Sequence, residues 1–369
     1  MVIAVIGPTL PGLSEQTQVD LSRISYIFTA HFLGYLLGAL FIGRLFDLIK
    51  GHRLMIVSLV TMAGAMTAVP FIHSHRLLVG LFLFLGAANG TLDVGCNTLI
   101  VQINKQNVGP FINGLHFFFG LGMFFSPFII AWILRAGEGF QWGYWILAIF
   151  IVFIACYMCF LESPEIQGRV KTGSGSRKNR RILILCVLFL LLHVGAQTSY
   201  GGWIVSYTIF KGLAAASSAA YLAATFYGLI AVGRLITVPL SRRSKPSVLL
   251  LIDLIGCILG VGVVLVWPRS IHMLWLGTIC EGLSMASVFP VTLHLIEEQI
   301  GLSGITAGWV LVGSSIGGMS FPMLVGQLFE SAGPDIMLII IMIDFVFASG
   351  VLALMIVKSF RQDNCARVE

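Results

Sequence analysis

Long apolar segments alternate with short polar ones along the whole chain. Eleven of them are long enough, at about 1.5 Å per residue of helix, to cross a hydrocarbon core of about 30 Å. This pattern predicts an all-α polytopic membrane protein. The segments run near residues 23–42, 54–72, 77–101, 112–134, 141–161, 182–208, 218–240, 247–267, 271–293, 304–329 and 336–357.

A shorter apolar segment, Met1 to Leu13, opens the chain. It covers about 20 Å as a helix, and it contains Gly7, Pro8 and Pro11, residues typical of a helix end. We expect it to be the outer half of a twelfth helix, truncated at the first residue of this sequence. The segment lacks the basic start and the small-residue cleavage site of a signal peptide.

Composition agrees with a membrane protein, because 57% of the residues are hydrophobic and only 10% are charged. The net charge of +6 does not indicate a nucleic-acid partner, because basic loops that face an anionic lipid leaflet explain it. With the first helix starting in the cytoplasm, most of the 22 Lys and Arg residues lie on the cytoplasmic side. The positive-inside rule then predicts both termini in the cytoplasm, and we expect a multi-pass protein of the plasma membrane. The basic residues outside are Arg23, Arg76, Arg135, Lys211 and Arg269.

A polar, glycine-containing and basic stretch divides the chain into two halves with six apolar segments each. The halves repeat: counting Met1 to Leu13 as the first segment, Gly43-Arg44-Leu45 at the end of the second recurs as Gly233-Arg234-Leu235 at the end of the eighth. Duplicated six-helix halves are typical of secondary carriers, which bind their solute near the membrane midplane. We therefore expect an N-terminal bundle at 1–161, a cytoplasmic linker at 162–181, a C-terminal bundle at 182–360 and a cytoplasmic tail at 361–369.

Glycines four residues apart recur in several segments. Small residues at this spacing let membrane helices approach each other closely. The sequence therefore predicts tight, movable helix contacts at Gly34 and Gly38, Gly86 and Gly90, Gly256 and Gly260, and Gly313 and Gly317.

Ionisable groups inside apolar segments are costly and indicate function. Asp93 is the strongest candidate, because Asn89, Asp93 and Asn97 share one helix face at four-residue intervals. A carboxylate at this depth suits a proton or a small cation. The alternative is a hydrogen-bond ladder between helices, worth about 0.6 kcal/mol per contact. His31 and Tyr35, one turn apart in the second segment, are possible partners of Asp93.

Three further acids lie in apolar segments of the second half. Glu281, at the centre of the tenth segment, is predicted to be a second cation-coupling group facing the same cavity as Asp93. Asp253 and Asp344 are interpreted as packing or folding features.

Amide, imidazole and aromatic side chains suit sugar hydroxyls and sugar rings. They gather in the fourth and fifth segments and around Gly201-Gly202 in the seventh, where we expect the helix to break. Packing hydrogen bonds between helices and an interfacial aromatic belt remain the alternatives. The predicted substrate-binding residues are Asn89, Asn97, Asn113, His116, Gln197, Tyr200 and Trp203.

The loop from Gly43 to Arg53 resembles the signature loop between the second and third helices of the major facilitator superfamily. In that family, the loop helps to close the cytoplasmic side, which implies a cytoplasmic gate at Gly43, Asp47, Gly51 and Arg53. The match is partial, because Leu48 stands where a basic residue is usual and Lys50 stands where the glycine is expected. The alternative is an ordinary basic loop.

Longer stretches resemble the fucose permease and sodium-dependent glucose transporter branch of that superfamily. They are Gly90 to Asn97, Asn113 to Pro127, Ser199 to Ile204 and Phe289-Pro290. The resemblance implies the fold with two pseudo-symmetric six-helix bundles, and a fourth-helix acid tied to cation-coupled uptake, here Asp93. Relatives often carry an acid at the position of Gln197, so the resemblance does not fix the coupling ion.

The function predicted from these features is secondary active transport of a small polar solute, most simply a monosaccharide, by alternating access coupled to a proton or a sodium ion. An exporter of drugs or other amphipathic compounds is the alternative. An enzyme is disfavoured, because HExxH, GxSxG and P-loop patterns are missing. A receptor or scaffold would tolerate Asp93→Asn. We expect no cofactor or metal beyond the coupling ion, and a monomer whose partners are the solute and the bilayer.

Overall fold

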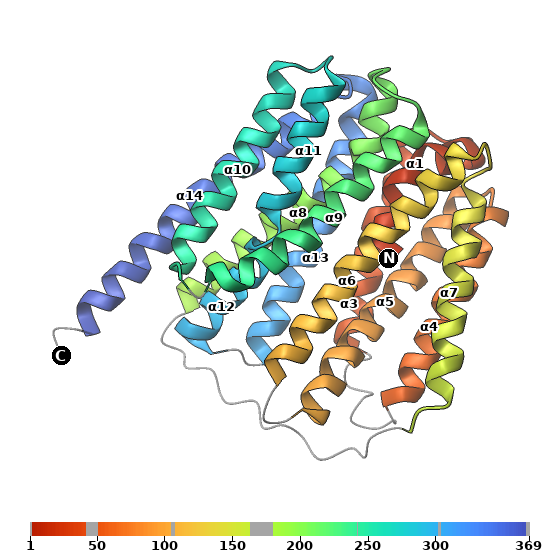
Figure 1. The fold of residues 1–369 in the computed structure, drawn as a ribbon. Coiled ribbons are helices and arrows are strands. Elements are labelled where there is room, and N and C mark those ends of the chain that lie inside the picture. Colours follow the sequence, from red (N-terminus) through yellow and green to blue (C-terminus); the bar gives the residue numbers. More distant parts are fainter. Residues whose placement is uncertain are drawn as a thin grey trace.

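The computed structural model describes residues 2–41, 51–104, 108–162, 180–241, 243–301 and 304–366. These residues form a bundle of helices that run roughly alongside one another (Figure 1). In chain order the helices are α1 (Val2–Thr17), α2 (Leu21–Ile24), α3 (Tyr26–Phe41), α4 (Gly51–Ala68), the 3₁₀ helix η2 (Val69–Phe71), α5 (His75–Ile103), α6 (Val108–Arg135), α7 (Gln141–Cys159), α8 (Arg180–Phe210), α9 (Ala216–Ser241), α10 (Pro246–Val266), α11 (Ile271–Met285), α12 (Val288–Ile300), α13 (Gly304–Ala332) and α14 (Ile336–Ala366).

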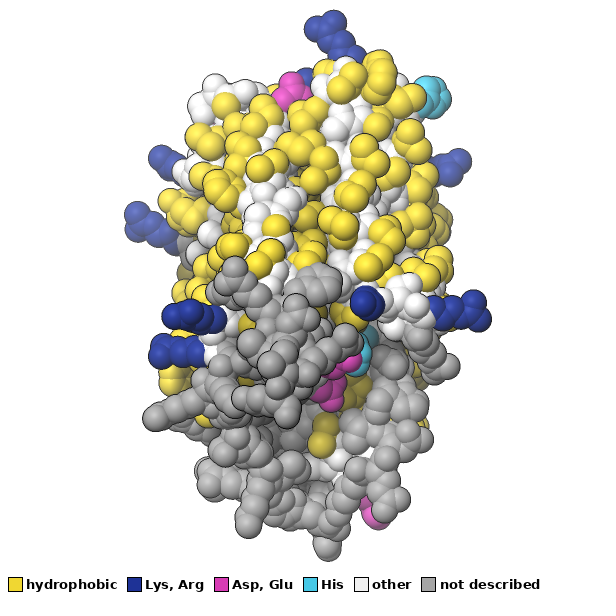
Figure 2. Space-filling model, turned by 90° about the vertical axis from the view of Figure 1, so that its left-hand side faces the viewer, with side chains coloured by type: hydrophobic (Ala, Val, Ile, Leu, Met, Phe, Trp, Pro, Cys, Tyr) yellow, Lys and Arg dark blue, Asp and Glu magenta, His cyan; other side chains and the backbone are white. Residues whose placement is uncertain are grey.

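Among the described residues, eleven helical segments are long and apolar enough to cross a membrane, and they coincide with the eleven predicted segments. The shorter α1, of 16 residues, packs among them on α6 and α8, and we number the segments with α1 as the first. The tenth crossing is made of α11 and α12, which meet just before Pro290, where the ring removes one backbone donor and disfavours a straight helix. Figure 2 shows one face of the molecule, on which hydrophobic side chains cover much of the described surface, as lipid contact requires.

The first helix differs from the prediction. We expected it to end near Pro8 and Pro11, but α1 continues through both prolines to Thr17. Prolines are tolerated in membrane helices when neighbouring polar groups satisfy the freed carbonyls. Packing of the surrounding helices holds α1 in shape, since Val5, Ile6, Leu10 and Leu13 are all 0% exposed. The Thr9 hydroxyl, between the two prolines, donates to the carbonyl oxygen of Val5 at 2.8 Å and lies 2.9 Å from the Tyr144 hydroxyl of α7.

The contacts between helices repeat in the two halves of the chain. In the first six crossings, α3 packs on α5, α1 on α6, and α4 on both α5 and α7. The same pairings recur in the second six as α9 with α11, α8 with α13, and α10 with α11 and α14. The duplication predicted from the Gly-Arg-Leu repeat is therefore present in the packing, as two pseudo-symmetric groups of six helices.

The GxxxG pairs lie where helix backbones cross most closely. A Cβ atom added to Gly34 of α3 would lie 2.0 Å from the carbonyl oxygen of Leu83, and one added to Gly86 of α5 would lie 2.0 Å from that of His31. Gly38 and Gly90 meet backbone just as closely. The other two pairs also lie at helix contacts, so the predicted close packing is confirmed.

The two groups of helices meet along two symmetry-related seams, α3 with α13 and α6 with α9, and α1 also packs on α8. We call the end of the bundle where α7 stops and α8 begins the linker end, and the opposite end the far end (Figure 1). At the far end, the backbone N–H of Leu21 donates to Glu330 at 2.9 Å, and the Gln327 amide donates to the carbonyl of Ser22 at 2.8 Å. Deeper in the same seam, the Phe32 ring packs against Gly318.

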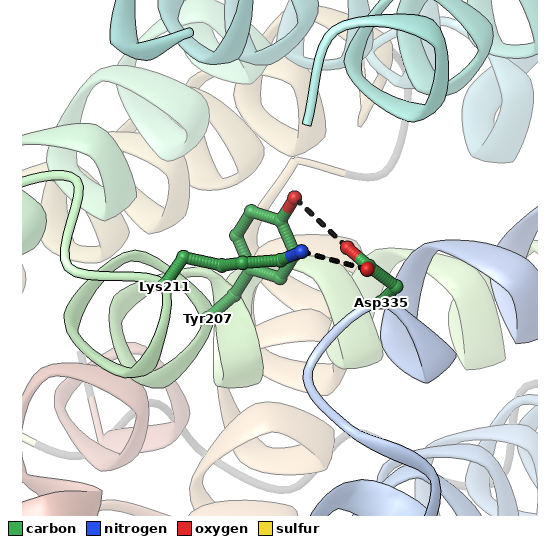
Figure 3. A network of polar contacts seen from close by, with 3 residues as sticks. All are labelled: Tyr207, Lys211 and Asp335. Carbon is green, nitrogen blue, oxygen red and sulfur yellow. Dashed lines mark hydrogen bonds and ion pairs between the residues drawn. The ribbon is translucent and has the colours of Figure 1, made fainter. Parts of the chain in front are cut away.

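The far end also carries an ion pair within the second group (Figure 3). The ammonium of Lys211, just after α8, lies 2.7 Å from the carboxylate of Asp335, and the Tyr207 hydroxyl donates to the same carboxylate at 3.4 Å. Because the Asp335 side chain is 41% exposed, water screens this pair, and such pairs contribute at most about 1 kcal/mol. Its role is to tie the end of α8 to the start of α14.

Candidate functional site

The predicted polar face of α5 forms the centre of the candidate site. Asp93 is half-buried, and its carboxylate accepts a hydrogen bond from the Tyr35 hydroxyl of α3 at 2.6 Å. The Asn97 amide donates to the backbone oxygen of Asp93 at 2.9 Å and to its carboxylate at 3.3 Å. Asn89, one turn away on the same helix, is also half-buried. The carboxylate is therefore oriented by two donors, and the predicted pairing with Tyr35 is confirmed.

His31 has a different environment. It is buried, its Nδ1 atom has no hydrogen-bond partner among the described residues, and its ring packs edge-on against Phe32. Of the two residues expected to partner Asp93, only Tyr35 forms a hydrogen bond with it in this structure.

His116 brings α6 into the site. Its half-buried imidazole lies within electrostatic range of Asp93 on α5 and of Arg234 on α9, so it stands between an acid of the first group and a base of the second. Asn113, predicted on the same face, has its side chain outside the described part of the chain.

Arg234 is the residue that the sequence reasoning missed. It was counted among the basic residues of the cytoplasmic side, but it lies inside α9 (Ala216–Ser241), as it does within the predicted segment 218–240. Its Nε atom is buried and has no described hydrogen-bond partner, and its charge reaches both His116 and His193. The signal was present, because Arg234 is an ionisable residue within an apolar segment, which by itself indicates a functional position.

The seventh crossing contributes Gln197 through the linker-side half of α8. Gln197 is half-buried and interacts with His193, one turn earlier, which in turn lies near Arg234. Residues of α3, α5, α6, α8 and α9 thus place carboxylate, amide, imidazole and guanidinium groups along the contact between the two groups of helices.

Tyr200 and Trp203 lie further toward the far end, and protein atoms enclose both completely. The Tyr200 hydroxyl is 2.9 Å from that of Thr278, while the Trp203 indole donates to the carbonyl of Pro322 at 3.0 Å and its ring packs on Phe28 and Phe329. In this structure the two rings hold helices together, and their predicted contact with solute stays a prediction.

The predicted break at Gly201-Gly202 is wrong, because α8 is one uninterrupted helix from Arg180 to Phe210. The two glycines serve close packing instead. A Cβ atom on Gly7 of α1 would lie 2.4 Å from the carbonyl oxygen of Gly201, and one on Gly202 would lie 2.7 Å from the Phe28 ring. The absence of side chains therefore lets the first group of helices pack directly on α8.

Glu281 does not share a face with Asp93. It is fully buried inside the second group, where its electrostatic neighbours are Tyr200, Cys257 and Cys280. Among the gate residues, Gly51 is buried at the start of α4 and Arg53 is exposed, whereas Gly43 and Asp47 lie outside the described residues. Within the described ranges, no three His, Cys, Asp or Glu side chains gather closely enough to hold a metal ion.

The paired groups of six helices, with polar side chains along their contact, define a membrane transporter built from two halves. The sequence profile of the Major Facilitator Superfamily matches residues 1–293, and the chain belongs to this family. It is an integral, multi-pass membrane protein that transports a small-molecule solute, and the family consists of transporters rather than enzymes.

Two curated relatives carry the name of sodium-dependent glucose transporters. Sodium-dependent glucose transporter 1 of Xenopus laevis is 29% identical over 359 residues, which cover 89% of this chain and 73% of that protein. Sodium-dependent glucose transporter 1A of Mus musculus is 28% identical over 374 residues, which cover 91% of this chain and 88% of that protein. The resemblance to this branch is thereby confirmed.

Solved structures share the fold at much lower sequence identity. A mutant of the nucleoside transporter NupG superposes with a TM-score of 0.75 at 12% identity, covering 96% of this chain and 98% of that one. A bacterial homologue of the human lysosomal transporter Spinster gives a TM-score of 0.72 at 12% identity, covering 97% and 94%. These similarities concern the fold alone.

Proposed function

We propose that this protein is a secondary active carrier of a monosaccharide, coupled to a proton or a sodium ion through Asp93. The supporting observation is the arrangement of Asp93 with Tyr35 and Asn97, together with His116, which lies within electrostatic range of Asp93 and of Arg234 in the second group. Fixed hydrogen-bond donors and acceptors suit a polyhydroxylated solute. The names of the two relatives support a sugar and a cation.

The two groups of helices are proposed to move as the bundles of an alternating-access cycle, with the boundaries 1–161 and 182–360. Described contacts join them from Ser22 at the far end to Phe32 and Gly318 near mid-depth. His116 and Arg234 lie beyond that depth, toward the linker end of α6 and α9. This arrangement supports an alternating-access cycle with a conformation in which the far end is closed while the site is open toward the linker end. We propose that the linker end faces the cytoplasm.

The proposed function predicts concentrative uptake by the purified full chain in proteoliposomes. We expect a hexose to accumulate under an imposed proton or sodium gradient, and not when ionophores dissipate that gradient. A panel of radiolabelled sugars, nucleosides and lipophilic cations, tested with each gradient separately, measures this. Accumulation of no solute in the panel would overturn the proposal, and transport confined to lipophilic cations would replace it by drug export.

The closed far end yields a second prediction. Gly7→Ala should open this end, because the new Cβ atom would lie 2.4 Å from the Gly201 carbonyl oxygen at the contact of α1 with α8. Overpacking of this kind costs about 1–3 kcal/mol, which corresponds to a shift of about 5- to 150-fold between two conformations. Spin labels on exposed Glu138 and Arg269, one in each group at the far end, report the change as a longer distance.

Gly64→Ala is the matched control, since a Cβ atom at this helical position meets nothing within 4 Å. It should leave the distance distribution of the spin labels unchanged. An unaltered distribution in Gly7→Ala as well would contradict the proposed closure at α1 and α8.

A further inference from the structure

Three acidic side chains from three helices of the second group surround one thiol. Asp253 of α10, Glu281 of α11 and Asp344 of α14 all lie within electrostatic range of Cys257. In the described part of the chain, no lysine or arginine is among the interaction partners of these three carboxyl groups. The cluster is also separate from the Asp93 site, whose own neighbours are Tyr35, Asn97, Cys96 and His116.

Two of the three carboxyl groups are enclosed by the protein. Glu281 is 0% exposed and Asp344 is 1% exposed. Neither oxygen of Asp344 has a hydrogen-bond partner among the described residues, and the neighbours of the Glu281 carboxyl group include the Cys257 thiol and the Val261 backbone. An enclosed carboxylate without a counter-charge costs several kcal/mol, and a weak thiol donor offsets little of this cost. A second anion nearby raises the cost further. Both groups are therefore stable in this arrangement only when they are neutral, with a proton on each.

Asp253 differs from the other two. It is half-buried, it accepts a hydrogen bond from the Ser287 hydroxyl, and it lies about 10 Å along α10 from the linker-end residue Pro246. A partly accessible, hydrogen-bonded carboxyl next to two enclosed ones is suited to exchange protons with water at that end.

The groups that face Glu281 bind a proton better than a metal ion. Besides the acids, they are the Cys257 thiol of α10, the Cys280 thiol of α11 and the Tyr200 hydroxyl of α8. Thiols are poor ligands for hard cations such as sodium, which prefer several oxygens. The Tyr200 hydroxyl also pairs with Thr278, one turn before Glu281, so Glu281 is linked to α8, the helix that packs on the first group at Gly201.

We propose that Glu281 and Asp344 form a second proton-binding site inside the second group of helices, which exchanges protons through Asp253 when α10, α11 and α14 rearrange. Glu281 lies at the close crossing of α10 and α11, where a Cβ atom on Gly260 would be 3.0 Å from its carboxyl oxygen. A shift of either helix therefore changes the surroundings of this carboxyl group directly. The link to transport rests on the proposed carrier function, but the existence of the site does not.

Carbodiimide labelling tests the site without any transported solute. Dicyclohexylcarbodiimide adds to protonated carboxyl groups in apolar surroundings, and peptide mass spectrometry of the full chain in lipid vesicles locates the adduct. We expect adducts on Glu281 and Asp344 at mildly acidic pH that decline as the pH rises and do not change when choline replaces sodium. Exposed Asp335 should remain unlabelled.

Two labelling results would overturn the proposal. One is the absence of an adduct on Glu281 and Asp344 at every pH while a reporter, a buried glutamate in a helical membrane peptide added to the same vesicles, is labelled. The other is protection of Glu281 by sodium, which would make the cluster a metal-ion site. Glu281→Gln should remove its own adduct and keep that of Asp344, which shows that the variant is folded.

The transport assay tests the link to the cycle. Glu281→Gln keeps the volume of the side chain and its neutral state, so the protein should still transport, but the ratio of uptake at acidic to alkaline pH should fall toward one. If the ratio is unchanged in Glu281→Gln, the proposal that Glu281 exchanges its proton during transport is wrong. If the wild-type protein transports no solute, the proposed carrier function is wrong. The labelling experiment still tests the proton-binding site, because it does not depend on transport.

Discussion

Asp93→Asn is expected to abolish accumulation of solute against a gradient while exchange of solute across the membrane continues. One coupled cation at a membrane potential of 100 mV supplies about 2.3 kcal/mol, enough for roughly 50-fold accumulation. The amide cannot release a proton or supply a negative charge to a sodium ion. The accumulation ratio of the variant should therefore fall to about one.

Folding should survive this substitution, because asparagine has nearly the same shape as aspartate. Its amide oxygen can still accept the hydrogen bond that the Tyr35 hydroxyl donates to Asp93 at 2.6 Å. Exchange, which needs only binding and rocking of the two bundles, should proceed at a comparable rate. Measurement of gradient-driven uptake and of counterflow in the same proteoliposomes separates the two effects.

Asp335→Asn is the matched control for Asp93→Asn. It makes the same chemical change at the far-end ion pair with Lys211, outside the candidate site, and should preserve accumulation (Figure 3). Accumulation by Asp93→Asn at the wild-type level would assign cation coupling to another group.

The spans were predictable from the sequence because bilayer thickness sets their length. Any segment that crosses needs about 20 apolar residues, so its position follows from composition without knowledge of its neighbours. The helix pairs of the repeat and the GxxxG crossings followed for a similar reason, since duplication and small residues constrain packing locally. The end of α1 was not predictable in this way, because its continuation past Pro8 and Pro11 depends on the helices that enclose Val5, Ile6 and Leu10.

Only the α5 side of the candidate site could be predicted from the sequence. The face of Asn89, Asp93 and Asn97 follows from helix periodicity alone, but which helices face it depends on packing across the whole bundle. Arg234 was counted only as a basic residue of the cytoplasmic side although it lies inside the predicted segment 218–240, and Glu281 was expected to face the cavity of Asp93 but lies inside the second group. Hydrophobic length gives the depth of a residue, and it gives no information about the direction of its side chain.

Gly86→Ala is expected to destabilise the fold itself. The added Cβ atom would lie 2.0 Å from the carbonyl oxygen of His31, and this neighbour is backbone, so only separation of α3 from α5 relieves the clash. Gly34, Gly38 and Gly90 meet backbone at 2.0–2.1 Å along the same crossing, so that separation would disturb all four contacts. We expect a loss of about 1–3 kcal/mol, seen as a lower apparent Tm in detergent and a smaller monodisperse peak on gel filtration.

Gly80→Ala on the same helix isolates the cause. A Cβ atom at Gly80 meets nothing within 4 Å, and alanine favours helix over glycine by about 1 kcal/mol, so this variant should be neutral or slightly more stable. Equal Tm values for the two variants would contradict the close crossing of α3 and α5. A selective loss at Gly86 would support the close crossing of α3 and α5, the same crossing at which Gly90 packs on the Tyr35 backbone and the Tyr35 hydroxyl reaches Asp93.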